Sequence, residues 1–266
     1  MGVLDRFRKK KEEEPRPSGP KAESVTPGGS SVYRYEEQEH GLRPPQSCGS
    51  CAEEIAAHFA ALFPERESFV YHELVSDLVH IDVNILRPKE GADFYVLYTT
   101  GMSDLPMTLP EDIADREDLK YGELFLFLPG DWDLGREHQL GSDLPYEQFW
   151  PIQMLKYFAR FPHEYHTWLG WGHSIPNGPR YEPICRGVGF GGVVLVQPQG
   201  VVPLDTEDGR HINFYMMVPA YKEEIEYKLK YGMEALGRRF VEGRLPMVLD
   251  TRRPNLCADF DEVLDQ

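Results

Sequence analysis

FVYHELVSDLVHIDVNILRPKEGADFYVLYTTGMSDLPMTLPE, residues 69–111, is the stretch that most constrains the fold. In residues 79–85 (VHIDVNI) branched apolar and polar side chains alternate, which is the period of a strand that buries one face. His80, Asp82 and Asn84 therefore share the exposed face of this predicted strand. Side chains two apart on a strand lie roughly 6.5–7 Å from each other. His80 and Asp82 can therefore flank one bound group or meet through a water, and the spacing alone does not establish a direct pair.

Further apolar runs predict the remaining strands of a sheet. We expect strands at 69–75, 94–100 and 123–128. The continuous apolar runs at 193–196 and 212–218 are typical of central strands that are buried on both faces.

Three helices are predicted from apolar residues at helical spacing. The first spans 51–63, with Ser50 as its N-cap. The second, at 147–160, is expected to end before Pro162 because proline interrupts a helix. The third spans 221–240. The order helix, strands, helix, strands, helix predicts an α+β fold, with a mixed, largely antiparallel sheet packed with helices in a single main domain.

Composition sets the expected limits of that domain. Residues 1–45 are rich in Gly, Pro, Ser, Glu and Lys and offer little apolar surface, so we expect a disordered N-terminal tail. The main domain is predicted at 46–243. Residues 244–266 are expected to form an irregular C-terminal tail with an acidic end.

The acidic balance of the chain restricts its partners. Lys plus Arg total 28 against 44 for Asp plus Glu, a formal charge of −16. Such a field repels phosphate backbones and anionic lipids, so we expect no nucleic-acid partner. A basic or neutral protein partner is favoured electrostatically, but acidity of this size also serves ordinary solubility, and that is the preferred interpretation. No apolar run approaches the roughly 20 residues of a membrane helix, and the N-terminus lacks a signal-peptide core. We therefore expect no membrane span and a cytoplasmic location.

The cysteines do not indicate a cofactor or a disulfide framework. The chain has 4 cysteines, too few for such a framework at this length. Cys48-Gly-Ser-Cys51 has the spacing of a zinc or redox pair, but Cys185 and Cys257 stand alone and supply no second pair. We interpret Cys48 and Cys51 as two unlinked thiols, and we expect no cofactor.

A first group of polar residues, His72, Glu73, Ser76, His80 and Asp82, surrounds the opening strand. A histidine beside carboxylates can serve as a general base. The same residues can instead form a hydrogen-bond network that fixes two strands, or a face that binds a partner. With no nucleophile, phosphate loop or metal set, we favour the network or binding face over catalysis.

A second group, Gly101, Met102, Ser103, Asp104 and Met107, follows the predicted strand at 94–100. The strand ends in glycine, which allows a positive φ, and the serine and aspartate then stabilise the turn through side-chain hydrogen bonds. Exposed methionines suit adaptable protein contacts, whereas buried ones belong to a core. The sequence leaves both readings open.

A third group consists of His163, His166 and His173 near two tryptophans. Its spacing is not HExxH, because the second histidine comes one residue too early to share a helical face with the first. The three could supply zinc ligands from a loop, but a packed aromatic region is the favoured interpretation. The rival function is therefore a hydrolase or metal-dependent enzyme that uses either His80 and Asp82 or these three histidines.

Several blocks of sequence, taken in order, resemble the suppressor-of-fused domain family, and its bacterial members in particular. The blocks are HELVSDLVHIDV (72–83), YVLYTTGMSDLPM (95–107), ELFLFLPGDW (123–132), FWPIQMLKYFARFPHEYHTWLGWGHSI (149–175), GVVLVQP (192–198) and INFYMMVPAYKEEIEYKLKYGMEAL (212–236).

The resemblance implies a non-catalytic protein-binding module. Some bacterial members are similar to immunity proteins, so a cognate toxin that the chain neutralises is the implied partner, and the first two groups above are the implied partner-binding residues. In animal members the Ser-Asp-Leu element lies near a groove that takes an extended peptide as an added strand. An aromatic residue follows that element there, whereas Pro106 follows it here, so the animal partner's binding mode is not carried over.

Overall fold

A mixed sheet forms the centre of the computed structural model, which describes residues 19–36, 43–45, 49–73, 76–134 and 145–260. Within these residues the sheet has eight strands, and all neighbours are antiparallel except β6 and β10, which are parallel. The prediction of an α+β domain with a largely antiparallel sheet is confirmed. In spatial order the strands are β3 (Ser68–Tyr71), β4 (Asp82–Leu86), β5 (Phe94–Thr100), β6 (Tyr121–Pro129), β10 (His211–Ala220), β8 (Gly192–Val196) and β7 (Ser174–Pro176), with β9 (Leu204–Asp205) paired to β10.

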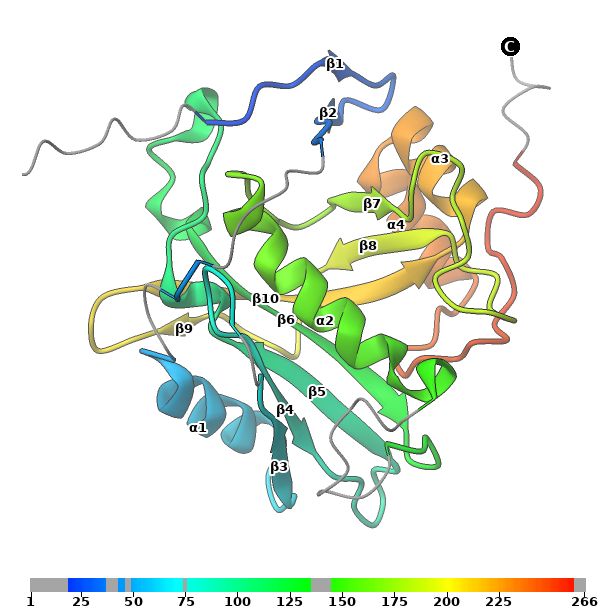
Figure 1. The fold of residues 1–266 in the computed structure, drawn as a ribbon. Helices are drawn as coiled ribbons and strands as arrows, with labels where there is room; N and C mark the ends of the chain where they lie inside the picture. Colours follow the sequence, from blue (N-terminus) through cyan, green and yellow to red (C-terminus); the bar gives the residue numbers. More distant parts are fainter. Residues whose placement is uncertain (1–18, 37–42, 46–48, 74–75, 135–144, 261–266) are drawn as a thin grey trace, which may run out of the picture.

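Helices cover both faces of the sheet (Figure 1). α2 (Tyr146–Glu164) packs on one face, with a core that includes Ile81, Val83 and Leu126. The opposite face packs on α1 (Ala52–Leu62), α3 (Lys222–Tyr231) and α4 (Met233–Glu242). None of the described helices is long and apolar enough to cross a membrane.

The alternation at residues 79–85 correctly predicts which side chains are buried. Val79, Ile81, Val83 and Ile85 are all fully buried in the core beneath α2. The regular strand begins only at Asp82, however, three residues later than predicted. The predicted central strands are also confirmed, since nearly every residue of β8 and β10 is buried.

Two predicted helix boundaries are wrong. α2 continues through Pro162 to Glu164. Proline removes a single backbone donor, and the packing of Phe158 and the buried His163 holds the last turn in place. The predicted helix at 221–240 is interrupted at Gly232, which adopts φ 88° and ψ 164° and separates α3 from α4.

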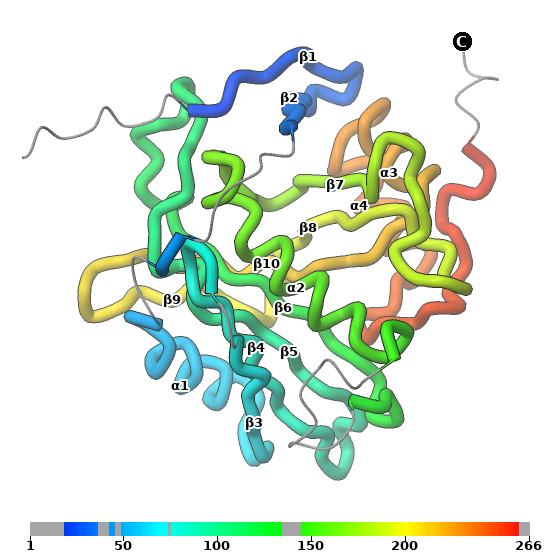
Figure 2. The backbone as a smooth tube through the Cα atoms, in the orientation of Figure 1, coloured from blue at the N-terminus to red at the C-terminus, as the bar shows by residue number. Residues whose placement is uncertain are grey.

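Part of the expected N-terminal tail contacts the folded body. β1 (Ser24–Val25) and β2 (Ser31–Val32) form a small hairpin, traced in blue in Figure 2. The Gly28 N–H donates to the carbonyl of Leu229 at the end of α3 (2.9 Å). The Tyr35 hydroxyl lies 2.5 Å from the Thr167 hydroxyl. Residues 1–18 of the expected tail lie outside the described residues.

After α4 the chain is irregular, but its side chains are anchored. Arg253 is buried and forms a bidentate ion pair with Glu224, with both N–O distances 2.6 Å. The Arg253 guanidinium also lies over the rings of Phe190 and Tyr221. The Leu256 N–H donates to the same carboxylate (3.0 Å). Residues 253–256 are therefore fixed to the start of α3.

Candidate functional site

The first polar group forms one cluster of hydrogen bonds and ion pairs at the start of β4. The Asp82 carboxylate lies 2.9 Å from His72 Nδ1 and 3.0 Å from His80 Nε2. The other nitrogen of His80, Nδ1, lies 2.5 Å from Ser76 Oγ. The Glu73 N–H also donates to Asp82 (2.9 Å). All five residues of the predicted group are thus brought together.

His80 and Asp82 are in direct contact, which the spacing along a strand did not establish. That spacing applies to a regular strand over 79–85, but the chain enters β4 from a turn. Leu78 has a positive φ of 66°, and a bridge between Asp77 and Val79 closes the turn. His80 is therefore not held at strand spacing, and its ring can reach the carboxylate.

α2 contributes two cations to this cluster. Arg160 bonds the Glu73 carboxylate and donates to the Asp77 carbonyl (3.2 Å). Lys156 lies one turn earlier on the helix. Burial lowers the pKa of the Lys156 ammonium, while the Glu73 and Asp82 carboxylates oppose this shift. The cluster is thus tied to both the sheet and α2, and His72, with its side chain 68% exposed, forms its open rim.

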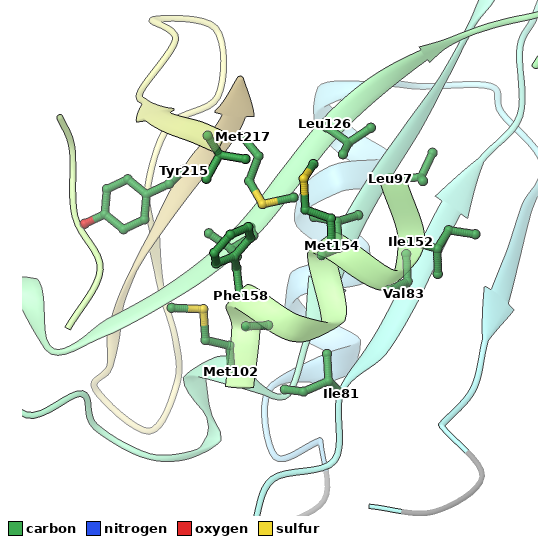
Figure 3. Close-up of a cluster of buried hydrophobic side chains, with 14 of the residues drawn as sticks. Ile81, Val83, Leu97, Met102, Leu126, Ile152, Met154, Phe158, Tyr215 and Met217 are labelled. Carbon is green, nitrogen blue, oxygen red and sulfur yellow. The ribbon is translucent and has the colours of Figure 1, made fainter. Parts of the chain in front are cut away.

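The second group is part of the buried framework. Gly101 has φ 108°, which confirms the predicted positive φ, and a Cβ at this position would lie 1.9 Å from the His80 carbonyl oxygen. Met102, Ser103 and Asp104 form the short turn η1 and are all buried. Figure 3 places Met102 in the same apolar cluster as Ile81 and Phe158.

Asp104 and Met107 have structural contacts of their own. The Asp104 carboxylate accepts hydrogen bonds from the Gly49 and Ser50 N–H groups (2.6 and 2.9 Å). The Ser50 hydroxyl also donates to Asp104 (2.9 Å), so the prediction that Ser50 caps α1 is wrong, and Cys51 occupies the N-cap. Met107 is buried, with its sulfur 3.3 Å from the Leu169 N–H. The second group therefore joins α1 to the sheet.

Glu123 is the central residue of this framework, and sequence reasoning missed it. It is fully buried and accepts hydrogen bonds from the N–H groups of Gly101 (3.0 Å) and Ser103 (2.9 Å). The hydroxyls of Ser103 and Thr99 each lie 2.6 Å from it. Burial raises the pKa of the Glu123 carboxyl to about 7, although the Ser103 and Thr99 hydrogen bonds oppose the shift. The sequence signal that could have indicated its role is a single charged residue at the start of the apolar run ELFLFLP.

The three histidines of the third group do not meet. His163 is buried and its Nε2 lies 2.8 Å from the Met102 carbonyl oxygen, while the ring of His173 packs on Trp168 (4.4 Å between centroids). Burial lowers the pKa of both imidazoles to about 4. His166 is exposed. Across the described part of the chain, no group of three or more His, Cys, Asp or Glu side chains is placed to hold a metal ion.

The sheet splits between β6 and β10, and the C-terminal segment lies at the split. β10 pairs with β6 only as far as Met216 and Phe125. β6 continues beyond this point, and Val248 forms a parallel bridge with its Phe127. The Leu249 N–H donates to the Phe127 carbonyl (2.8 Å). We call residues 245–249 the strap.

A small, largely apolar hollow lies beside the strap. Three methionines, Met216, Met217 and Met247, contribute to its wall, and Met247 is 46% exposed. The strap therefore borders a small hollow where β6 and β10 separate, and sequence reasoning did not find this feature. The remaining lining residues are Leu126, Phe127, Val218, Pro219, Leu245, Pro246, Leu249, Asp250 and Arg253.

A family match and several similar solved structures were found for this chain, while no curated protein matches it. The family described as suppressor of fused protein (SUFU) matches residues 77–254. A crystal structure of a putative SUFU homolog from Neisseria gonorrhoeae FA 1090 is similar to this chain, with 14% identity and a TM-score of 0.53. The similarity covers 77% of this chain and 95% of that one.

Two further solved structures share the fold. The Sufu–Fu complex matches with 14% identity and a TM-score of 0.54, over 82% of this chain and 97% of that one. Drosophila Suppressor of Fused matches with 15% identity and a TM-score of 0.50, over 79% of this chain, which spans 52% of the Drosophila protein. With the match over 77–254, these findings show that the chain belongs to the suppressor of fused family.

Proposed function

We propose that the chain is a protein-binding module that takes an extended segment of a partner as an added strand beside β6. The observation that carries the proposal is the split of the sheet, where Val248 of the strap bridges Phe127. An extended segment parallel to β6 fits at this place, because the chain's own strap already occupies it. Partner strands that extend a sheet gain main-chain hydrogen bonds in the same way.

The strap is joined to β6 by the Val248 bridge and is anchored by the buried side chain of Leu249. Its bridge rests on the hydrogen bond from the Leu249 N–H to Phe127, and such a bond contributes about 0.5–1.5 kcal/mol net. Arg253 is fixed separately by Glu224. We infer that an incoming segment displaces residues 245–249 from β6 while Arg253 keeps the rest of the C-terminal segment in place.

The hollow beside the strap suits side chains of varied shape. Methionine is unbranched and polarizable, and exposed methionines adapt to different partners. Of the three methionines that line this hollow, Met247 is 46% exposed, whereas Met216 and Met217 are buried. A relative has been solved as a complex with a protein, Fu. These observations support a protein partner with an extended, apolar segment.

A photo-crosslinking experiment tests the binding surface. A benzophenone amino acid placed at Met247, which lines the hollow, should capture the partner in cells that produce both proteins. The same group at Val241, which is 79% exposed on α4, is the matched control. Equal capture from both positions, or capture from Val241 alone, would contradict the proposal.

We further propose that the partner is a toxin that this chain neutralises as an immunity protein. The formal charge of −16 supports a basic partner, because opposite charges speed encounter. Exposed acidic residues at Glu111, Asp112 and Asp115 add to this field. Each neighbouring gene should be expressed alone and with this chain. Rescue of growth from one toxic neighbour is the expected result, and a set of non-toxic neighbours would count against the role.

A further inference from the structure

Met247 is the exposed methionine of the strap. It is 46% exposed, and it also lines the hollow beside β6. Oxidation turns the apolar thioether of a methionine into a polar sulfoxide, a change that can act as a switch. We propose that Met247 is an oxidation site and that its sulfoxide loosens the strap from β6. The regulatory consequence rests on the proposed function, because the edge that the strap uncovers is the one proposed for the partner.

The other methionines of the described residues are better protected from solvent. An oxidant in solution must reach the sulfur atom, so exposure sets the order in which methionines react. Met233, at the start of α4, is half-buried. The fully or largely buried methionines are Met102, Met107, Met154, Met216 and Met217. We therefore expect Met247 to react before any other methionine in the described part of the chain.

Met247 directly precedes the two residues that join the strap to the sheet. Val248 bridges Phe127, and the Leu249 N–H donates to the Phe127 carbonyl (2.8 Å). The side chains of Val248 and Leu249 pack on opposite faces of the sheet, in the two apolar cores. Met247 instead lines the hollow and is partly open to solvent. A displacement of its side chain therefore acts next to the backbone bond that holds the strap.

The reaction needs only a peroxide as co-reactant. The Met247 sulfur attacks one peroxide oxygen with a lone pair, so an S–O bond forms as the O–O bond breaks. The departing hydroxide takes the proton from the transferred oxygen and leaves as water. Sulfur thus loses two electrons and the peroxide gains them. A reductase that consumes two thiols, and yields a disulfide and water, reverses the step.

The sulfoxide does not suit the largely apolar hollow. Its oxygen is a hydrogen-bond acceptor, and burial of a polar group without a hydrogen-bond partner is unfavourable. The oxidised side chain of Met247 therefore turns toward solvent, and the strap loses its contacts in the hollow. The bond between Leu249 and Phe127 then opens more often, which uncovers the edge of β6.

Hydrogen exchange of single amides, followed by NMR, tests the proposal in the full chain without a partner. After brief treatment with dilute hydrogen peroxide, peptide mass spectrometry should find one added oxygen on Met247 before Met233. The Leu249 amide should then exchange faster by at least about 5-fold, which corresponds to the loss of a modest packing contribution. The Leu256 amide, which donates to Glu224, is the internal control and should keep its rate.

Two variants separate the sulfoxide from other effects of peroxide. Met247→Leu stays apolar but has no sulfur, so peroxide should leave the exchange of the Leu249 amide unchanged. Met247→Gln carries a polar group of similar length and should show faster exchange at Leu249 without peroxide. Oxidation of Met233 as fast as Met247 would overturn the site, and an unchanged Leu249 rate in the oxidised chain would overturn the loosening of the strap. Both measurements are independent of the crosslinking that tests the proposed function.

Discussion

Two constraints act on Gly101. Its φ of 108° lies in a region that L side chains rarely adopt, and an added Cβ would lie 1.9 Å from the His80 carbonyl oxygen. Gly101→Ala should therefore lower the free energy of unfolding by roughly 1–3 kcal/mol in urea denaturation. Gly209→Ala is the matched control, because Gly209 has φ 87° but nothing within 4 Å of the added Cβ. Equal losses would show that the contact with His80 has no effect.

The buried Glu123 carboxyl is expected to make the free energy of unfolding depend on pH. Its pKa of about 7 lies above the usual 4.5, because burial disfavours the ionised form. The folded chain thus holds this proton more tightly, so the stability it contributes is present below about pH 4.5 and is lost as the pH rises toward 7. Over this window the unfolding free energy of the wild type, relative to Glu123→Gln, should fall by on the order of 3 kcal/mol. If urea denaturation gives the same difference in unfolding free energy between the wild type and Glu123→Gln at every pH, this prediction is contradicted.

At the scale of elements, the segment 19–36 is expected to stabilise the domain through Tyr35. Its ring packs edge-on against Phe161 and its hydroxyl bonds Thr167. Tyr35→Ala should cost roughly 1–3 kcal/mol of unfolding free energy, from one hydrogen bond and its aromatic contacts. Tyr33→Ala, at a neighbouring half-buried position, is the control. A loss no greater than in that control would show that the segment is only loosely attached.

The buried pair of Glu224 and Arg253 attaches the C-terminal segment to α3. Arg253→Met removes one partner and leaves a buried carboxylate unpaired, so a loss of about 3–5 kcal/mol is expected. The double variant with Glu224→Leu should recover part of this stability, because neither charge then remains buried. Calorimetric melts of the single and double variants would measure both the loss of stability and its partial recovery. Additive losses would mean that the two residues act independently.

Local patterns could predict the elements but not the contacts between distant segments. The alternation at 79–85 correctly assigned the buried face, because a strand's period depends only on neighbouring residues. The roles of Glu123 and Asp104 depend on donors contributed by other turns, so their partners could not be deduced from spacing. Met102 could have been exposed or buried, and only the packing beneath α2 decides that it is buried. The extension of α2 through Pro162 likewise depends on tertiary packing.

At the scale of the whole molecule, the split sheet brings together segments far apart in the chain. Phe127 and Val248 meet only because β10 leaves β6 after Met216. No local pattern indicates this arrangement. In the proposed function, an incoming segment enters beside the strap and the hollow without unfolding the domain. Strand addition beside β6 is the central claim of this account.

Binding of the strap sequence in trans tests that claim most directly. A fluorescent peptide of residues 244–250 (RLPMVLD) would be titrated against the wild type and against Leu249→Ser, which weakens the resident strap at its buried anchor. Val241→Ser and a scrambled peptide are the controls. We predict saturable binding that is tighter for Leu249→Ser than for the wild type and for Val241→Ser. Binding of this peptide no stronger than the scrambled one, in a folded Leu249→Ser variant, would contradict strand addition at β6.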